Sequence, residues 1–273
     1  MNDANKQTTF LKWAGGKQWL APRLGELFPK KFRRYFEPFL GGGSLYFSVR
    51  PIKAILGDAN PRLIEMFLAV RDNPRSVIKQ LQKWQYTKED YYRIRSSVFD
   101  SRYVRAAQFI YLNRTCWNGL YRVNRRGDFN VPFGVFENPT ICNELAILSA
   151  SALLKKATIN CADFENTVRR ASKGDLVYFD PPYTVAHANN GFVKYNEKIF
   201  SWQDQQRLAK TATDLRKRGC HVLISNAMHP SICDLYKGFH LVSFPRKSLL
   251  AGDPTKRRDI TEALFSSYAL IRN

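Results

Sequence analysis

The chain has 273 residues, of which 44% are hydrophobic, so it is long and apolar enough to bury a core in one or two domains. Its 43 lysines and arginines outnumber its 23 acids, and this excess of +20 favours a polyanionic partner over an indifferent basic surface. The five cysteines and four histidines form neither a Cys-x-x-Cys pair nor a His-Glu-x-x-His motif, which argues against a metal site.

The cellular setting follows from two further features of the sequence. No stretch reaches the roughly 18 apolar residues of a membrane-spanning helix, and the first residues, MNDANKQTT, lack the apolar core of a signal peptide. We therefore expect a soluble protein of the reducing cytoplasm, without a membrane partner and with thiols that are buried or idle.

Short apolar runs alternate with segments that have helical character. Runs typical of strands buried on both faces lie at 34–39, 53–58, 157–160, 175–180 and 221–226. Segments typical of helices lie at 44–49, 61–70 and 202–219. This alternation predicts an α/β fold with a mostly parallel sheet. The last two runs, at 239–244 and 263–271, have no helix between them, so we expect the sheet to end in an antiparallel pair.

The middle of the chain, residues 62–156, departs from this alternation. Amphipathic helical stretches at 76–84 and 101–113 precede an Arg-rich segment, NRTCWNGLYRVNRRGDFNVPFG. Within it, LYRVNRRGDFNV predicts a β-hairpin with Arg126, Gly127 and Asp128 at or near the turn. We therefore predict a main domain made of residues 1–61 and 157–273, and an inserted helical domain, 62–156, that carries a basic hairpin.

Two features at expected strand ends suggest a nucleoside ligand. The three glycines of FEPFLGGGSLYF, Gly41 to Gly43, come between a strand and a helix, where a backbone without side chains can approach a ligand. Asp58 ends the next strand, where an acid can accept hydrogen bonds from a ribose. The phosphate-binding loop motif and the full dinucleotide motif are both absent. A cofactor without a pyrophosphate fits best, and S-adenosylmethionine, with Lys17 near its carboxylate, is the leading candidate.

The segment FDPPYT, at 179–184, follows the apolar run GDLVYF and predicts chemistry on an amino group. The amino group of a base is a poor nucleophile, and it becomes reactive when its N–H bonds are accepted. Asp180 can accept one of them, the carbonyl of Pro181 the other, and the fixed φ angles of Pro181 and Pro182 hold that carbonyl in place. Tyr183 can stack on a flipped base. Methylation at cytosine carbon 5 would need a thiol after a proline, which none of the cysteines provides.

Together these motifs resemble the Dam-type DNA adenine-N6 methyltransferases, in which the cofactor motif comes first and D-P-P-Y last. The resemblance runs from about Phe10 to Ile271, through the blocks FLKWAGGK, EPFLGGGS, GDANPRLI, LNRTCWNGLYRVNRRGDFNVPFG and VYFDPPY. It implies a Rossmann-like S-adenosylmethionine-dependent methyltransferase sheet with an inserted target-recognition domain. It also implies that the enzyme flips adenine out of double-stranded DNA, usually in GATC, either alone or beside a restriction endonuclease. Because base flipping requires no dimer, we expect the enzyme to act as a monomer.

The resemblance assigns roles to individual residues. Those assigned to the cofactor are Trp13, Lys17, Glu37, Gly41, Gly43, Ser44, Asp58, Asp163, Phe164 and Asp180. Those assigned to the DNA, with Asn124 and Arg126 added from the predicted hairpin, are Lys12, Trp117, Asn118, Leu120, Arg122, Asn124, Arg126, Pro132, Lys256, Arg257 and Arg258. In such an interface an Arg on a hairpin can read a guanine edge, and an aromatic side chain can fill the opened duplex.

Two departures from the family pattern affect the DNA assignments. Trp117 stands where relatives often have Tyr, and residues 246–264 replace an Asn-Gly-rich stretch, so Lys256, Arg257 and Arg258 are equally well explained as a solvated charge run. Residues 184–200 form a long connection that predicts either a lid over the flipped base, with Phe192 and Tyr195 as contacts, or a surface loop.

Three alternatives remain open at the level of sequence. Cytosine-N4 methylation uses the same amino-group chemistry, although such enzymes more often have Ser in place of the acid. A DNA-binding regulator with the same fold but no activity would keep the basic surface. RNA methylation is disfavoured, because a basic hairpin suits the major groove of B-form DNA better than that of A-form RNA.

Overall fold

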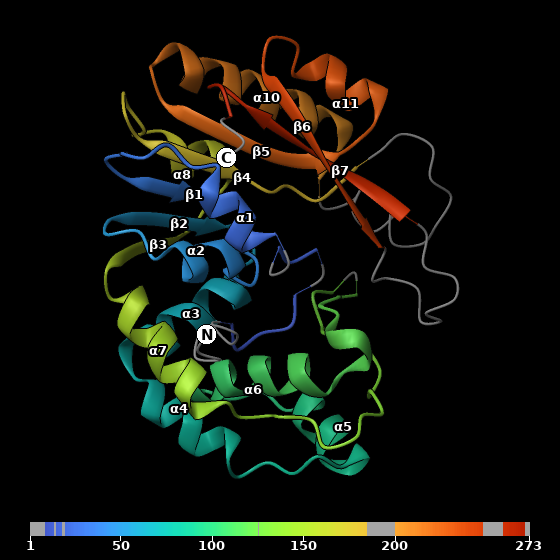
Figure 1. Cartoon of the computed structure of the whole chain (residues 1–273). Helices are drawn as coiled ribbons and strands as arrows, with labels where there is room; N and C mark the ends of the chain where they lie inside the picture. Colours follow the sequence, from blue (N-terminus) through green and yellow to red (C-terminus); the bar gives the residue numbers. More distant parts are fainter. Residues whose placement is uncertain are drawn as a thin grey trace, which may run out of the picture. The chain divides into compact units, whose positions relative to one another are not determined.

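The computed structural model describes residues 9–13, 15–17, 20–124, 126–184, 200–247 and 259–270. The strands in this part of the chain are β1 (Tyr35–Glu37), β2 (Ala54–Asp58), β3 (Ala157–Cys161), β4 (Leu176–Phe179), β5 (His221–Ala227), β6 (His240–Lys247) and β7 (Asp259–Ser266). They form one sheet in the order β3-β2-β1-β4-β5-β7-β6 (Figure 1). The pairs β2–β3, β1–β4 and β4–β5 are parallel, whereas β7 runs antiparallel to both β5 and β6. The predicted α/β class with an antiparallel C-terminal pair is confirmed.

Helices overlap all five segments that the sequence predicted as helical, 44–49, 61–70, 76–84, 101–113 and 202–219, and further helices were not predicted. They are α1 (Ala21–Glu26), α2 (Ser44–Val49), α3 (Pro61–Asp72), α4 (Pro74–Leu81), α5 (Lys88–Ser96), α6 (Arg102–Thr115), α7 (Glu144–Leu154), α8 (Phe164–Val168), α10 (Trp202–Lys217) and α11 (Pro230–Leu235), with a short 3₁₀ turn, η2 (Trp117–Gly119). Asn60 caps the amino end of α3, where its side chain accepts hydrogen bonds from two backbone N–H groups, and Pro61 is the first residue of the helix. α10 begins with a capping box between Ser201 and Asp204.

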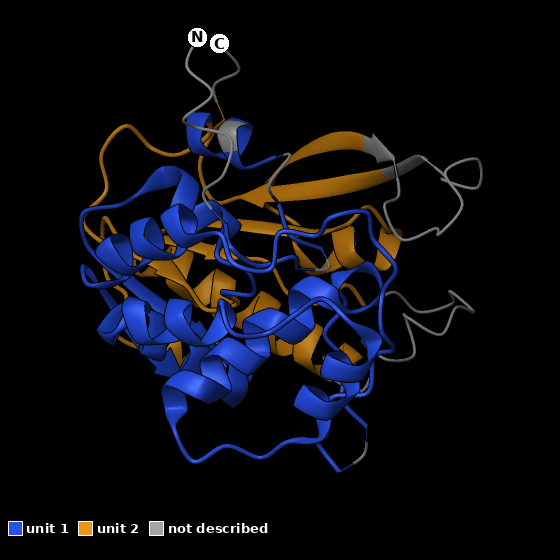
Figure 2. Ribbon diagram, turned by 90° about the horizontal axis from the view of Figure 1, so that it is seen from below, with its two compact units in different colours: residues 1–26, 40–163 blue, residues 27–39, 164–273 orange. Residues whose placement is uncertain are grey.

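The chain divides into two compact units (Figure 2). Unit 1 comprises Met1–Glu26 and Leu40–Asp163, and unit 2 comprises Leu27–Phe39 and Phe164–Asn273. In unit 1, α3 packs against α6 and α7 and also against β2 and β3, so residues 62–156 share a core with the two strands beside them. The division at 61/62 and 156/157 that the sequence suggests stays a prediction.

Unit 2 is built around β4. All four residues of β4 are buried, as are all three of β1, which gives the apolar character that made both runs recognisable. α10 packs against β5 and buries Leu208, Ala209, Ala212 and Leu215. Among the described residues, no helix is long and apolar enough to span a membrane. The thiols of Cys116 and Cys220 are buried and that of Cys161 is exposed.

Candidate active site and nucleic-acid interface

In unit 2, Asp180 directly follows β4, at the edge where the parallel strands β1, β4 and β5 end. The strand order changes direction between β1 and β4. Ligands of open α/β sheets bind beyond the carboxyl ends of strands at such a reversal. The topology therefore places the carboxylate singled out by the sequence where this fold binds its ligands.

The backbone after Asp180 is fixed by a chain of buried amides. The carbonyl of Pro182 accepts a hydrogen bond from Nε2 of Gln205 in α10, at 3.4 Å. Oε1 of Gln205 in turn accepts a hydrogen bond from Nδ2 of Asn226 in β5, at 3.0 Å. Gln205 and Asn226 are both fully buried, and Thr184 donates a further hydrogen bond to the carbonyl of Phe200. The D-P-P-Y backbone is thus tied to two neighbouring elements, a feature that the motif alone does not reveal.

A second acid lies at the end of β1. Glu37 is 3% exposed, and its Oε2 accepts a hydrogen bond of 2.8 Å from the hydroxyl of Tyr35. Burial, and then the nearby carboxylates of Glu37 and Asp180, raise the pKa of Tyr35 and of Tyr178 well above the usual value. Both phenols therefore remain protonated at neutral pH, so that the Tyr35 hydroxyl is a permanent donor that orients Glu37.

Aromatic side chains pack together next to the same strand end. Phe164 is 3% exposed and stacks on Phe39, with ring centroids 5.5 Å apart. Phe179 and Phe200 contact both of these rings edge-on or at a tilt. Phe164, which the resemblance assigns to the adenine of the cofactor, is therefore held rigidly in an apolar cluster.

In unit 1, the glycine loop and Asp58 are linked directly. The N–H of Gly41 donates to Oδ2 of Asp58, and the N–H of Asn60 donates to Oδ1, each at 2.9 Å. Burial raises the pKa of Asp58, and these two N–H groups oppose the rise. Each carboxylate oxygen keeps a lone pair for another donor, so Asp58 can still accept hydrogen bonds from a ribose diol.

The glycines of this loop are required because Trp13 lies against them. A Cβ atom on Gly41, whose φ is +48°, would come within 2.7 Å of Nε1 of Trp13, and one on Gly42 within 2.9 Å of its Cβ. The indole also stacks with Phe109 and Tyr121, at centroid distances of 6.3 and 5.7 Å. Trp13 and the glycine loop are distant in sequence, and they are in contact within unit 1.

Three other cofactor candidates, Lys17, Gly43 and Asp163, also belong to unit 1. Lys17 is 3% exposed, and its ammonium group donates to the carbonyl of Gly15 at 3.0 Å. Gly43, with φ of +69°, precedes α2, which begins at Ser44. Asp163 comes between β3 and α8 and is half-buried.

The hairpin expected in unit 1 is present. Val123 and Phe129 form an antiparallel bridge, and the N–H of Asn124 donates to the carbonyl of Asp128 at 2.8 Å. Oδ1 of Asn124 accepts hydrogen bonds from the N–H groups of Arg126 and Asp128, so this side chain shapes the turn. The prediction of a turn at 126–128 is confirmed.

The side chains available for a ligand lie along this hairpin and the preceding 3₁₀ turn. Trp117 is 47% exposed, and Asn118, with φ of +53°, is also exposed, as is Pro132. Arg122 is exposed, and its guanidinium is held by Nε donating to Oδ1 of Asn130 at 2.8 Å. Leu120, by contrast, is half-buried.

Lys12 lies beside the same turn. Its backbone N–H donates to Oδ1 of Asn113 in α6 at 2.8 Å, and its carbonyl accepts from Nδ2 of Asn113. A Cβ atom on Gly119 would come within 2.6 Å of Cβ of Lys12, so the lysine stem packs on the turn. Its ammonium group lies 4.1 Å from the centroid of the Phe136 ring. Burial, and then nearby Arg114, lower the pKa of Lys12. Lys12 is thereby grouped with Trp117 and Asn118, as the resemblance implies.

Sequence reasoning missed a cavity of about 470 Å³ between the hairpin and α5 and α6. Its lining includes Arg62, Arg95 and Arg105. Each has a protein acceptor, since these guanidiniums donate to Gln108, to the carbonyl of Val131 and to Glu65. Because the residues come from three separate helices, no local pattern marks them. Residues 185–199 and Lys256, Arg257 and Arg258 lie outside the described residues, so the lid and the late basic contacts stay predictions.

Comparison with known proteins identifies the family. Residues 13–248 match the D12 class N6 adenine-specific DNA methyltransferases. The chain is 38% identical over 269 residues to the type II methyltransferase M1.LlaDCHI of Lactococcus lactis subsp. cremoris, covering 95% of both chains. It is 36% identical to the type II methyltransferase M.MjaIII of Methanocaldococcus jannaschii, covering 95% of this chain and 98% of the other. It is also 34% identical to the DNA adenine methylase of Vibrio cholerae, with 96% and 98% covered. This chain belongs to the D12 class of adenine-specific DNA methyltransferases.

Proposed function

We propose that this enzyme transfers the methyl group of S-adenosylmethionine to N6 of an adenine flipped out of duplex DNA, in GATC or a close variant. The observation that carries the proposal is the position of Asp180. It follows the buried strand β4 where the strand order reverses, and the backbone beyond it is tied to Gln205. An acid and a fixed carbonyl at that place suit the hydrogen atoms of an exocyclic amine.

The residues of unit 1 fit the cofactor. Without side chains on Gly41 and Gly42, the loop backbone and the Trp13 ring come into close contact, and Asp58 keeps acceptor capacity for ribose hydroxyls. S-adenosylmethionine, when bound, supplies an electrophilic methyl group on sulfur. Trp13, Gly41 and Asp58 of unit 1 would hold it. The resemblance to the family assigns Glu37 and Phe164 to the same cofactor.

The chemistry of this chain is done by acceptors rather than by a nucleophile. Asp180 accepts one N–H of the adenine amine and the Pro181 carbonyl accepts the other, which allows the nitrogen lone pair to turn out of the ring plane. The Asp180 carboxylate also stabilises the positive charge that develops on nitrogen. Tyr183 stacks on the flipped base and keeps it aligned, while groove contacts offset the few kcal/mol that flipping costs.

Target recognition falls to the hairpin of unit 1. Since Asn130 holds Nε of Arg122, the remaining guanidinium donors are presented in a fixed orientation, as bidentate recognition of a guanine requires. Trp117, nearly half exposed, is large enough to fill the space left by a flipped base. Arg122→Ala is expected to relax discrimination at one base position by about 1 to 3 kcal/mol. A uniform loss of affinity for all sequences would instead make Arg122 a phosphate contact.

The experiment that tests the function is transfer of a labelled methyl group to duplex oligonucleotides. GATC is compared with each of its single-base variants, and the product is digested to nucleosides. N6-methyladenine formed mainly in GATC supports the proposal. Methyladenine formed equally in several variants removes the GATC assignment, and label on cytosine N4 removes the choice of base.

A further inference from the structure

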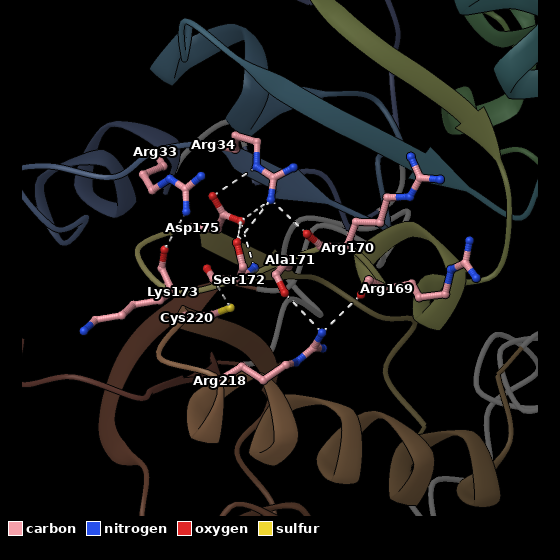
Figure 3. A network of polar contacts seen from close by, with 10 residues as sticks. All are labelled: Arg33, Arg34, Arg169, Arg170, Ala171, Ser172, Lys173, Asp175, Arg218 and Cys220. Atoms are coloured by element: carbon pink, nitrogen blue, oxygen red, sulfur yellow. Dashed lines mark hydrogen bonds and ion pairs between the residues drawn. The ribbon is translucent and has the colours of Figure 1, made fainter.

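A cluster of cationic side chains lies at the edge of unit 2 opposite Asp180. It is formed where β1, β4 and β5 begin, by the ends of three segments that precede these strands (Figure 3). We call it the basic edge, and its cationic members are Arg33, Arg34, Arg169, Arg170, Lys173 and Arg218. Neither the methyl-transfer site nor the recognition hairpin uses any of them.

Backbone hydrogen bonds hold the three segments together. The N–H of Arg33 donates to the carbonyl of Gly174 at 2.8 Å, and the N–H of Gly174 donates to that of Gly219 at 3.0 Å. Nη1 of Arg218 donates to the carbonyls of Arg169 and Ala171, each at 3.1 Å. The three segments of the basic edge are therefore held together by hydrogen bonds and form one continuous surface.

The glycines of these turns bring the long side chains close to the backbone. Gly174 has φ of +82°, and a Cβ atom there would lie 3.3 Å from Cδ of Arg33. Gly219 has φ of +78°, and a Cβ atom there would lie 3.1 Å from Cγ of Lys173. The positive φ angles favour glycine at both positions. Because glycine has no side chain, the aliphatic parts of Arg33 and Lys173 can pack directly against the backbone there.

Charge at the basic edge is strongly unbalanced. Among the residues drawn in Figure 3 the one carboxylate is that of Asp175, which is fully buried and paired with Arg34 at 2.6 Å. The other five cations are all exposed. Lys30, Lys31 and Arg216, also exposed, extend two of these three segments. Like charges gathered in this way repel one another, and the phosphates of a DNA backbone would neutralise them while the counterions condensed on the DNA are released.

We propose that the basic edge binds the phosphate backbone of a second DNA segment, distinct from the one whose adenine reaches Asp180. This inference rests on the proposed function only for its duplex DNA substrate. The four residues of β4 span about 13 Å, so the basic edge and Asp180 face opposite ends of the strand. Phosphates bound there do not belong to the flipped nucleotide. Such a second contact lets the enzyme pass between DNA segments without full release.

The test uses the full chain with two short duplexes that carry different dyes. One contains the target sequence and is bound first at equimolar concentration, and the second lacks the target. We expect energy transfer between the two dyes. Light scattering should show two duplexes bound to each protein monomer. R169Q/R170Q/K173Q, which alters only exposed side chains, is expected to weaken binding of the second duplex by at least about tenfold.

A matched control separates charge from side-chain identity. R169K/R170K/K173R keeps every charge, so it should bind the second duplex with affinity within about twofold of the native chain, as expected for phosphate contacts. When log K for the second duplex is plotted against log salt concentration, the slope for the neutralised variant should be smaller in magnitude by about 2 to 3. Methylation of the single short target should be unchanged in both variants.

The outcomes distinguish the two proposals. If the native chain methylates the target but binds no second duplex, or if neutralisation leaves that binding intact, the basic edge is not a DNA surface. Binding of single-stranded RNA or of an acidic protein there instead of duplex DNA would likewise overturn the inference. Absence of methyl transfer by the native chain would count against the proposed function and not against the second contact.

Discussion

The two ends of β4 carry an aspartate each, and the fold surrounds the two aspartates differently. Asp175, just before the strand, is fully buried, and its carboxylate accepts hydrogen bonds from Arg34 and from the N–H of Ser172. Asp180, just after the strand, is half-buried at the edge where the sheet order reverses. In a sequence both read as an acid next to an apolar run, so residue type alone does not separate them.

The difference lies in what the fold puts around each carboxylate. At the amino end the partner is a guanidinium 2.6 Å away, which satisfies the charge within the protein. At the carboxyl end, the neighbouring structure fixes the backbone instead, through Gln205 and the carbonyl of Pro182. A charge that the fold neutralises stabilises the fold, whereas an acid on a fixed backbone at the edge where such sheets bind their ligands is a candidate for chemistry.

The largest effect is expected from Asp180→Ala. Removing the carboxylate eliminates one acceptor for the amine and the charge that stabilises the transition state, so methyl transfer should fall by at least about 1000-fold. Binding of target DNA and its salt dependence should be retained, since these depend on other residues. Methyl transfer by the variant within tenfold of the native rate would contradict the assignment. The measurement is single-turnover transfer beside a binding titration.

A smaller loss of rate is expected from Gln205→Leu. The change removes the donor to the Pro182 carbonyl and leaves Asn226 without its acceptor. Because Gln205 positions the motif without touching the base, kcat should fall by about 10 to 100-fold with KM for DNA nearly unchanged. Gln206→Leu, on the exposed side of the same helix, is the control and should leave kcat unaltered. A rise in KM alone would refute the positioning role.

Asp175→Asn should show the reverse pattern, with a loss of stability and little loss of activity. It removes a buried charge that pairs with partly exposed Arg34, so the free energy of unfolding should drop by about 2 kcal/mol. The kcat of the folded variant should stay within about twofold, because Asp175 lies at the far end of the strand. Asp214→Asn is the comparison variant, since its exposed pair with Lys217 at 3.9 Å contributes little. Urea unfolding monitored by circular dichroism measures both.

The sequence predicted the secondary-structure elements better than the tertiary contacts between them. Periodicity identified β4 and α10, because a run of buried apolar residues and a capped amphipathic helix are local properties. The hairpin turn was equally local, since Asn124 and Gly127 carry its geometry. The stacking of Trp13 on the glycine loop and the Gln205–Asn226 link join residues distant along the chain, and only tertiary packing brings them together. Helix α5 went unpredicted because its residues, KEDYYRIRS, are mostly polar, and Thr87 caps it.

The smallest expected effect is the pH dependence of the difference in free energy of unfolding between the native chain and Asp175→Asn. This measurement isolates the contribution of the Asp175 charge. Burial alone would raise the pKa of Asp175, but the hydrogen bonds from Arg34 and Ser172 and the nearby Arg33 outweigh it and hold the pKa below its usual range. A carboxyl whose pKa is depressed by folding stabilises the folded state above its unfolded pKa of about 3.9, and this stabilisation is lost as the pH falls through the folded pKa. The difference in free energy of unfolding between the native chain and Asp175→Asn should therefore be constant from pH 7 to about 5 and decrease below about pH 4. A gap that persisted at the lowest pH at which the chain stays folded would mean that Asp175 acts through packing and neutral hydrogen bonds, and the contrast between the two ends of β4 would no longer be one of charge.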